Sequence, residues 1–281
     1  MINSIFSRIV TLKYKAFLFL AVALVFTAGC QIEPDTSGAP AIVGKIRRIE
    51  PVAVRPLSPV TRTIVGRSVE NRPIMAITIG RGSNATLVIG GIHGNEPAGV
   101  TLAHELADHL TANQHLLTSQ KVVIVPAANP DGLSRNQRNN IHGVDLNRNF
   151  TAANRMNNAK NGRFALSEPE SRTLQKLIAD HGPNRIITIH QPLACIDYDG
   201  PGRSLAEAMA ARCSLPVKKL GARPGSLGSY AGNTLGIPII TVELTRQDSR
   251  LSAGSLWSRY GKMATTAIAH NNSYRKVLTA K

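Results

Sequence analysis

Short apolar runs alternate with helical patterns along this chain from residue 85 onward, and this alternation constrains the fold more than any other feature. Uninterrupted apolar runs are typical of strands that are buried on both faces, as in parallel sheets covered by helices. The repeated strand–helix order therefore predicts an α/β fold: one domain with a mixed, largely parallel twisted sheet and helices on both faces. Strands are expected at residues 85–90, 121–126, 185–190 and 237–244, and helices at residues 97–110, 169–179, 204–211 and 251–270.

An antiparallel hairpin is expected before this alternation begins. Residues 62–65 and 73–79 flank a polar stretch, residues 66–72, that contains glycine and asparagine. Turn-forming residues between two such runs indicate a hairpin. We therefore place the domain at residues 62–281.

The first 61 residues have the composition of an export signal followed by a tether. Basic residues precede the apolar run 16–28, which is shorter than the roughly 20 residues that a membrane-spanning helix needs. This order is typical of a secretory signal, and the sequence Thr27-Ala28-Gly29-Cys30 resembles a bacterial lipobox. We expect a lipoprotein-type signal peptide at residues 1–29 and a flexible, proline-rich tether at residues 30–61.

Lipidation of Cys30 would hold the exported protein on the periplasmic side of a bacterial membrane. A cysteine that carries several acyl chains is a stable anchor, and Gln31 after Cys30 resembles outer-membrane sorting in Gram-negative lipoproteins. The alternative is an uncleaved anchor helix, which also places the domain outside the cytoplasm. The other cysteines, Cys195 and Cys213, are compatible with a disulfide or with free thiols.

Two residue types that bind metals follow the first buried strand. His93 and Glu96 lie in Gly90-Gly91-Ile92-His93-Gly94-Asn95-Glu96-Pro97, at the carboxyl end of that strand. In open α/β sheets, ligands bind beyond the carboxyl ends of the strands. Zinc accepts such nitrogen and oxygen ligands, and a catalytic zinc keeps one position for water. The pair by itself is equally compatible with local hydrogen bonding.

A second histidine and a late glutamate also end predicted strands. His190 closes the run 185–190, and Glu243 lies in Thr241-Val242-Glu243-Leu244. His190 would complete a His₂Glu ligand set for one zinc ion. A carboxylate in an apolar strand is costly without a task or a partner, and burial raises its pKa as a general base requires. The alternative for Glu243 is a salt bridge to a buried arginine.

The segment between residues 129 and 150 is rich in asparagine and arginine. It begins with the turn signature Asn129-Pro130-Asp131-Gly132 and continues through Arg138 to Gly143-Val144-Asp145-Leu146-Asn147-Arg148-Asn149-Phe150. Arginine binds carboxylates with two parallel hydrogen bonds, and asparagine adds a donor. This density indicates a site for an anionic group, with an ordinary polar loop as the alternative.

Together, these motifs resemble the M14 zinc carboxypeptidases. The shared order is His-x-x-Glu, Asn-Pro-Asp-Gly, Asp-x-Asn-Arg-Asn, a lone His and a Glu in a late apolar strand, from about residue 63 to the C-terminus. The resemblance implies a zinc carboxypeptidase-like fold and a zinc-dependent peptidase that cleaves a bond next to a free carboxylate. The implied roles are one Zn²⁺ bound by His93, Glu96 and His190, Glu243 as catalytic base, Arg138 as the group that polarises the scissile carbonyl, and Asn147 with Arg148 as the grip on a substrate carboxylate.

Within that family, two further stretches resemble murein tripeptide amidases. They are His190-Gln191-Pro192-Leu193-Ala194-Cys195-Ile196-Asp197 and Pro224-Gly225-Ser226-Leu227-Gly228-Ser229-Tyr230. This resemblance implies a peptidoglycan stem peptide as substrate, cleaved at its γ-D-glutamyl–diaminopimelate bond. Asp197 would pair with the free ammonium of diaminopimelate, and Tyr230 would contact the substrate. The export signal departs from these amidases, which are typically cytoplasmic.

Two other functions remain open at this stage. A zinc N-acyl-amino-acid deacylase, related to aspartoacylase and succinylglutamate desuccinylase, carries a similar Gly-x-His-Gly-Asn-Glu motif, but the Asn-Pro-Asp-Gly turn and the export signal argue against it. A non-catalytic wall-binding protein on a retired peptidase fold is disfavoured because all three ligands and the base are present. The net charge of +16 suits polyanions, but no zinc-finger, RRM or basic-helix signature is found, so nucleic acid is not an expected partner.

Overall fold

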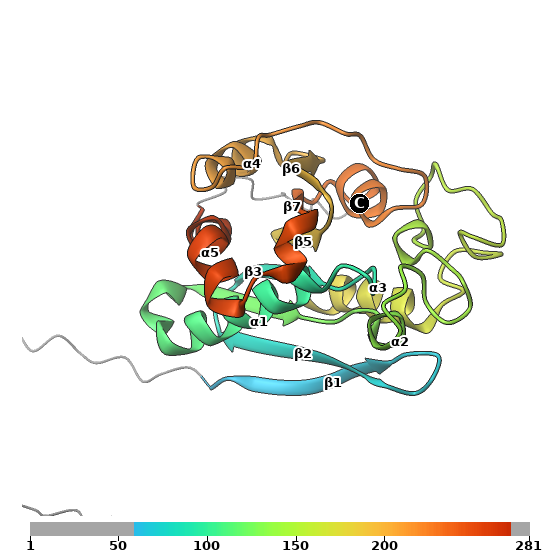
Figure 1. Cartoon of the computed structure of the whole chain (residues 1–281), viewed down its shortest axis with the longest axis horizontal. Coiled ribbons are helices and arrows are strands. Elements are labelled where there is room, and N and C mark those ends of the chain that lie inside the picture. Colours follow the sequence, from blue (N-terminus) through green and yellow to red (C-terminus); the bar gives the residue numbers. More distant parts are fainter. Residues whose placement is uncertain (1–58, 271–281) are drawn as a thin grey trace, which may run out of the picture. The chain divides into compact units, whose positions relative to one another are not determined.

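The computed structural model describes residues 59–270. The predicted signal peptide, Cys30 and nearly all of the predicted tether lie outside the described residues. Within them, a seven-stranded sheet has the strand order β1-β2-β4-β3-β5-β7-β6 (Figure 1).

The middle of the sheet is parallel and its edges are antiparallel. Strands β4 (Gln120–Val125), β3 (Asn84–Gly90), β5 (Arg185–His190) and β7 (Ile239–Thr245) run in one direction. The hairpin of β1 (Thr61–Arg67) and β2 (Pro73–Gly80) joins β4 antiparallel at one edge, and β6 (Leu193–Asp199) joins β7 antiparallel at the other. The four parallel strands therefore end at one edge of the sheet.

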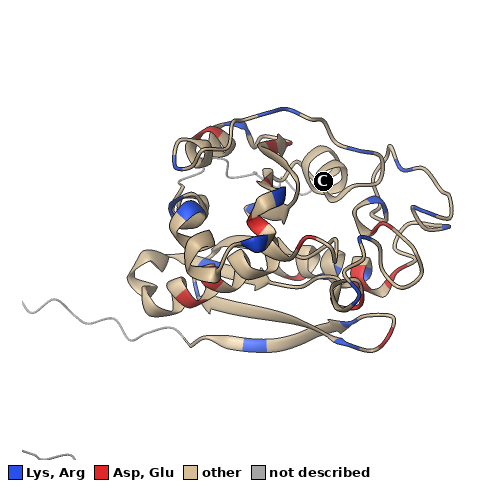
Figure 2. Cartoon of the chain, viewed as in Figure 1, with Lys and Arg blue, Asp and Glu red and all other residues tan. Residues whose placement is uncertain are grey.

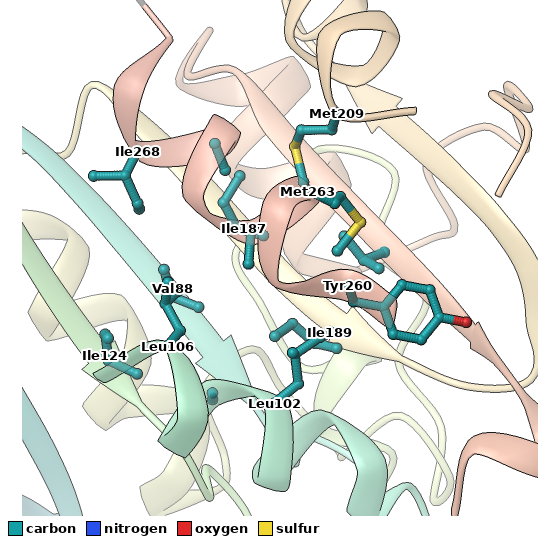
Figure 3. Close-up of a cluster of buried hydrophobic side chains, with 14 of the residues drawn as sticks. Val88, Leu102, Leu106, Ile124, Ile187, Ile189, Met209, Tyr260, Met263 and Ile268 are labelled. Atoms are coloured by element: carbon teal, nitrogen blue, oxygen red, sulfur yellow. The ribbon is translucent and has the colours of Figure 1, made fainter. Parts of the chain in front are cut away.

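Helices cover both faces of the sheet and form two hydrophobic cores. On one face, helices α1 (Pro97–Ala112), α4 (Arg203–Ala210) and α5 (Ala253–Ala269) pack on the larger core (Figure 3). On the other face, α3 (Pro169–His181) and the π-helix η3 (Gly228–Thr234) pack on the smaller core. Burial of apolar side chains on both faces explains why the central strands are almost entirely apolar.

Short helical segments complete the described part. They are η1 (Gln114–Leu117), α2 (Pro130–Ser134), η2 (Leu146–Arg148) and η4 (Arg246–Arg250). The predicted α/β class, the hairpin, the four parallel strands and the four long helices are confirmed, with boundaries that differ by up to about two residues.

Two features differ from the sequence expectation. The Asn-Pro-Asp-Gly stretch, predicted as a turn, opens the short helix α2, because the Asn129 side chain accepts a hydrogen bond from the Gly132 amide and Pro130 suits a first helical position. Strand β6 was not predicted, because its sequence places two acids, Asp197 and Asp199, on one face of a buried strand.

The structure also bears on a possible disulfide and on membrane-spanning helices. Cys195 and Cys213 are both free thiols. Within residues 59–270, no helix combines the length and the apolar character needed to cross a bilayer.

Candidate active site

Three parallel strands bring the predicted site residues to one edge of the sheet. His190 ends β5 and lies beside Glu243 on β7 in the strand register. His93 and Glu96 lie in the loop that leaves β3 and enters α1. The carboxyl ends of these strands therefore converge, as the sequence predicted.

The loop after β3 can follow its path only because it contains glycines. Gly91 has a φ of 60°, a conformation that glycine adopts without strain. A Cβ on Gly94 would lie 2.0 Å from the carbonyl carbon of Gly132 in α2. The absence of a side chain at Gly94 lets this loop pack directly on α2 and places His93 between β3 and the Asp145 segment.

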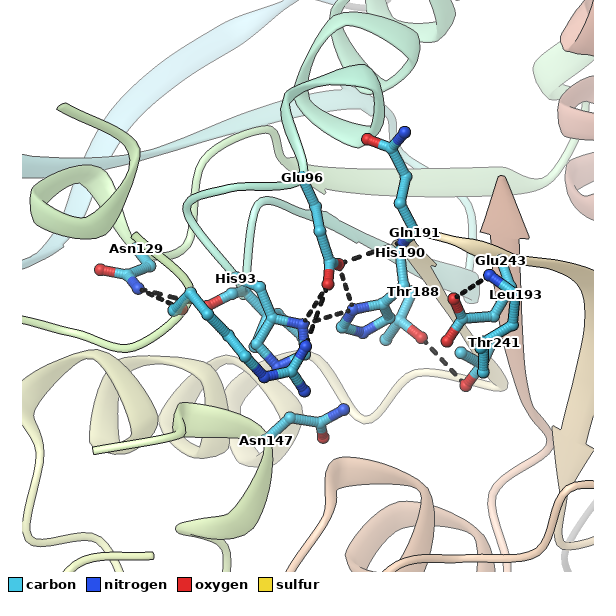
Figure 4. A network of polar contacts seen from close by, with 12 residues as sticks. His93, Glu96, Asn129, Asn147, Thr188, His190, Gln191, Leu193, Thr241 and Glu243 are labelled. Carbon is cyan, nitrogen blue, oxygen red and sulfur yellow. Dashed lines mark hydrogen bonds and ion pairs between the residues drawn. The ribbon is translucent and has the colours of Figure 1, made fainter. Parts of the chain in front are cut away.

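His93, Glu96 and His190 form a compact, buried cluster (Figure 4). Nδ1 of His93 lies 2.8 Å from Oε1 of Glu96, and Nδ1 of His190 lies 2.9 Å from Oε2. The two Nδ1 atoms are 3.1 Å apart. One ligand atom from each residue thus lies within 4.8 Å of the others, so the three side chains could bind one metal ion together.

The donor set also fits a divalent cation electrostatically. Burial would lower the pKa of His93, but its bonds to Asp145 and Glu96 outweigh burial and raise it. Burial would likewise raise the pKa of Glu96, but His190 and His93 hold it at about 2. The cluster thus gathers two imidazoles and the buried carboxylates of Glu96 and Asp145. Imidazole and carboxylate bind a metal ion in their deprotonated forms, so this set of donors suits a divalent cation.

Asp145 supports this cluster from the side. Its Oδ1 lies 3.1 Å from Nε2 of His93, and its Oδ2 accepts hydrogen bonds from Arg138 at 3.2 and 3.3 Å. An ionised carboxylate only accepts, so Nε2 of His93 carries the proton and Nδ1 is left for a metal. Asp145 belongs to the Asp-x-Asn-Arg-Asn motif, but the motif by itself does not predict its contact with His93.

Arg138 reaches the cluster by a second contact. Its Nη1 lies 3.3 Å from Oε1 of Glu96, and its side chain is 42% exposed. Asn129 donates from Nδ2 to the carbonyls of Ile92 and Arg138, both at 3.4 Å. The Asn-Pro-Asp-Gly segment therefore ties the loop that contains His93 to the loop that contains Arg138.

Glu243 lies at the open side of the cluster. Its Oε2 accepts a hydrogen bond from the Leu193 amide at 3.3 Å. Burial raises its pKa, and the neighbouring His190 opposes this only in part. No ion pair involves Glu243 among residues 59–270, so the alternative of a structural salt bridge to arginine has no support there.

A cavity of about 490 Å³ joins these groups. Its lining includes the three cluster residues, Glu243 and Arg138, and beyond them Asn147, Arg148 and Asp197. Oδ1 of Asn147 accepts from the Leu227 amide at 2.9 Å, so its Nδ2 donors are the free end of the amide. Burial lowers the pKa of Arg148, opposed by the nearby Asp145 carboxylate. Arginine and carboxylate side chains thus line the same cavity.

The segment between α4 and η3 forms the outer wall of the cavity. Leu220 and Arg223 from this segment line it, and Figure 2 shows basic residues spread along the same connection. The positive charge of Arg223 adds to burial in lowering the pKa of Arg148. Arg223 could not be predicted from the sequence as a cavity residue, because it is an isolated arginine in a Gly- and Pro-containing loop and belongs to no motif.

Tyr230 does not line this cavity. It lies in η3, where its ring stacks on Phe150 at a centroid distance of 6.1 Å. The π-helical turn directs it to the smaller hydrophobic core, which it joins as a partly buried member. Its role in substrate binding stays a prediction.

Comparison with known proteins also indicates a zinc carboxypeptidase. A family model described as zinc carboxypeptidase matches residues 55–199. Murein peptide amidase A from Escherichia coli (strain K12) is 34% identical over 197 residues, covering 63% of this chain and 78% of that protein.

Two solved structures share the fold. The crystal structure of murein-tripeptide amidase from Escherichia coli O157 matches with a TM-score of 0.58 and 29% identity, covering 80% of this chain and 98% of that one. Carboxypeptidase A from Helicoverpa armigera matches with a TM-score of 0.64 at 22% identity, covering 75% and 68%. The chain belongs to the zinc carboxypeptidase family and is a zinc metallopeptidase of the M14 type.

Proposed function

We propose that this enzyme hydrolyses the γ-D-glutamyl–diaminopimelate bond of peptidoglycan peptides. The observation that carries this proposal is the cavity in which a metal-type cluster, a raised-pKa carboxylate and three arginines face one another. The relatives named murein peptide amidase supply the substrate class. The stretches 190–197 and 224–230, which resemble those of murein tripeptide amidases, support the same bond.

His93, Glu96 and His190 would hold one zinc ion. Their converging Nδ1 and carboxylate atoms supply the nitrogen and oxygen donors that zinc prefers, and they leave the cavity side open. When bound, zinc supplies a Lewis acid that polarises a carbonyl and acidifies water. Asp145 keeps His93 in the tautomer that leaves Nδ1 free to bind.

Glu243 would act as the general base and then as the general acid. It takes a proton from the attacking water and returns it to the leaving amine nitrogen. Within the described residues, its one hydrogen bond is donated by the Leu193 amide to Oε2, which orients the carboxyl group and leaves Oε1 for this transfer. A pKa raised by burial brings the carboxylate nearer to working pH, where proton transfer in both directions is efficient.

The arginines would position the peptide. Arg138, oriented by Asp145, would donate to the scissile carbonyl oxygen as negative charge develops on it. Arg148 and the free amide end of Asn147 would bind the carboxylate of the leaving residue. These two contacts fix the position of the scissile bond relative to Glu243.

The protein would work outside the cytoplasm, anchored through lipid on Cys30. This part of the proposal rests on the order of basic residues, apolar run and lipobox-like sequence before Cys30. Radiolabelled palmitate should enter the wild-type protein and not Cys30→Ser, and the variant should leave the membrane fraction. Equal labelling of both proteins would contradict the anchor.

Incubation of purified protein with wall digests tests the reaction. Mass spectrometry should find free L-alanyl-γ-D-glutamate and diaminopimelate-containing products, which are absent after chelation and with Glu243→Gln. Acyl-aspartate and acyl-glutamate serve as control substrates. Hydrolysis of these alone would favour a deacylase, and zinc binding without hydrolysis of any wall peptide would favour a wall-binding protein.

A further inference from the structure

Two recesses adjoin the active-site cavity beside the short helix η4. The inner recess has a volume of about 130 Å³ and shares Glu96 and Arg138 with the cavity. The outer recess, of about 410 Å³, shares Asn95, Arg246 and Ser249 with the inner one. Because each space shares lining residues with the next, the two recesses form one surface, here called the η4 groove, that leads outward from the proposed metal site.

The η4 groove lies on the other side of the proposed zinc ligands from the site for the leaving residue. Gln191 lines the inner recess, and Figure 4 shows its side chain across the cluster from Asn147. Of these three spaces, Asn147 and Arg148 line the main cavity alone. If these two residues bind the carboxylate of the leaving residue, the acyl part of the substrate extends past the cluster in the opposite direction. The η4 groove is therefore placed to receive the acyl residue.

Hydrogen bonds fix the start of η4 relative to the cluster. Nε2 of Gln191 donates to the Thr245 carbonyl at 2.8 Å, and the Gln191 amide donates to Oε2 of Glu96 at 3.2 Å. The buried carboxylate of Asp248 accepts from the Thr245 amide at 2.7 Å. Arg246 follows Thr245 directly, so its backbone is held at a fixed position beside Glu96.

Two arginines of η4 line this groove without a partner. Arg246 lines both recesses, and Arg250 lines the outer one. Both residues are exposed, and within residues 59–270 their guanidinium groups form no hydrogen bond and no ion pair. Among the described residues, Glu96 is the one acid that lines either recess, and it is already bonded to both histidines of the cluster. The η4 groove therefore carries an uncompensated positive charge, which attracts an anionic group.

A γ-linked glutamyl residue supplies such a group on the acyl side of the scissile bond. Because its side-chain carboxyl group forms the peptide bond, its α-carboxylate stays free, about 5 Å from the scissile carbonyl carbon in an extended chain. The inner recess is lined both by Arg138, which would bind the scissile carbonyl oxygen, and by Arg246. One small recess therefore separates the reacting carbonyl from an unpaired guanidinium group.

We propose that Arg246 binds the free α-carboxylate of a γ-linked glutamyl residue on the acyl side of the scissile bond. This inference rests on the proposed peptidase function and adds the substrate feature that the η4 groove recognises. A guanidinium group donates two parallel hydrogen bonds to a carboxylate. A carboxamide of the same shape offers one acceptor oxygen and turns an NH₂ donor toward the guanidinium donors. Arg246 thus favours the acid over its amide.

Matched substrates isolate this contact. The tripeptides L-alanyl-γ-D-glutamyl-diaminopimelate and L-alanyl-γ-D-isoglutaminyl-diaminopimelate have the same number of heavy atoms and differ in an α-carboxylate against an α-carboxamide. The zinc-loaded wild-type enzyme should show a kcat/KM about 5- to 20-fold higher for the carboxylate peptide. This range lies between the effect of an exposed ion pair and that of a buried hydrogen bond to a charged group, because Arg246 is exposed to solvent. Equal kcat/KM values for the two peptides would overturn the inference.

The variant Arg246→Gln removes the charge from the groove. It should bring the ratio of the two kcat/KM values close to one, by slowing the carboxylate peptide more than the carboxamide peptide. The matched control is Arg212→Gln, which removes the same charge from an exposed arginine that lines neither the cavity nor the η4 groove. This control should keep the wild-type ratio. A wild-type ratio in Arg246→Gln, or an equal fall in Arg212→Gln, contradicts the contact.

Binding separates this inference from the proposed reaction. Dissociation constants of the two peptides, measured by calorimetry in zinc-loaded Glu243→Gln and in Glu243→Gln/Arg246→Gln, report the preference without turnover. Tighter binding of the carboxylate peptide that is lost with Arg246, together with no hydrolysis of either peptide by the wild type, refutes the reaction and supports the contact. Hydrolysis of both peptides at equal rates, with equal dissociation constants, refutes the contact and supports the reaction.

Discussion

The carboxylate of Asp145 lies 3.1 Å from Nε2 of His93, on the side of the imidazole that faces away from Glu96 and His190. The other oxygen of Asp145 holds Arg138. One acid therefore orients both a proposed zinc ligand and the group proposed to bind the scissile carbonyl. Substitution of Asp145 should therefore weaken both metal binding and polarisation of the scissile carbonyl.

Asp145→Asn should weaken zinc binding by about 10- to 100-fold, the usual effect of removing a carboxylate that supports a histidine ligand. It should also lower kcat with zinc at saturation, because Arg138 loses an ionic partner. Chelator competition measures the first effect and steady-state kinetics the second. The control is Asp180→Asn, which removes an exposed ion pair to Lys176. Wild-type zinc affinity in Asp145→Asn would contradict the supporting role.

Replacement of the proposed base should separate metal binding from catalysis. Glu243→Gln keeps the shape of the side chain and an acceptor for the Leu193 amide, but it cannot take a proton. We expect stoichiometric zinc by atomic absorption and a kcat reduced by about 10²- to 10⁴-fold. Full turnover in this variant would remove Glu243 from the mechanism.

The acidic limb of the pH profile should reflect the environment of Glu243. Burial raises its pKa above the ordinary glutamate value, and the base acts only when it is ionised. The kcat/KM should therefore rise with pH through this raised pKa and fall as the carboxyl group becomes protonated at lower pH. A profile measured with zinc in excess, on a substrate that does not titrate between pH 4 and 8, tests this. A rate that is constant down to the ordinary glutamate pKa would contradict it.

Removal of zinc should abolish activity and lower stability. The apo cluster buries the Glu96 carboxylate against two imidazoles, and a cation bound only by the folded state stabilises it by mass action. At a free zinc concentration 100 times the dissociation constant, the gain is about 2.7 kcal/mol. Chelation should therefore lower the thermal midpoint, and added zinc should restore both midpoint and activity. An unchanged midpoint in Glu96→Gln after zinc addition serves as the control.

The packing of α5 should depend on a buried phenol. Tyr260 is fully buried, and its hydroxyl donates to Oδ2 of the buried Asp248 at 2.8 Å. Tyr260→Phe should lower the free energy of unfolding by about 1–2 kcal/mol, because Asp248 loses one donor but keeps the Thr245 amide. Urea denaturation measures this. Tyr198→Phe is the control, since its hydroxyl makes no hydrogen bond within residues 59–270. An effect no larger than that of the control would contradict the prediction.

Much of this site could be read before any coordinates were known. The apolar runs that end at Gly90, His190 and Leu244 identified parallel strands, and side chains that follow such strands must meet at one edge. His93, Glu96 and His190 were therefore predictable as neighbours, and the structure brings them together. Asp145 could have been assigned from the motif that contains it, but its contact with His93 spans 52 residues of sequence.

Other features depend on contacts that no local pattern encodes. Strand β6 escaped prediction because Asp197 and Asp199 are buried in it. Their partners come from the segment after α4: Lys219 pairs with Asp199, and the Leu220 amide donates to Asp197. Tyr230 looked suited to the cavity from its motif, but the π-helical turn of η3 directs it to Phe150. The local sequence predicts neither the partners of these two acids nor the direction of the Tyr230 side chain.

The sequence by itself determined the α/β class, the edge of the sheet where the site lies and the residue types gathered there. Apolar runs and their order along the chain are local features, and they suffice to predict parallel strands whose carboxyl ends share one edge. Tertiary structure alone decided that Asp145 contacts His93, that Lys219 pairs with Asp199, and that Asp197 accepts a hydrogen bond from the Leu220 amide. Those outcomes follow from the packing of segments distant in sequence, where burial and hydrogen-bond competition assign each polar atom its partner.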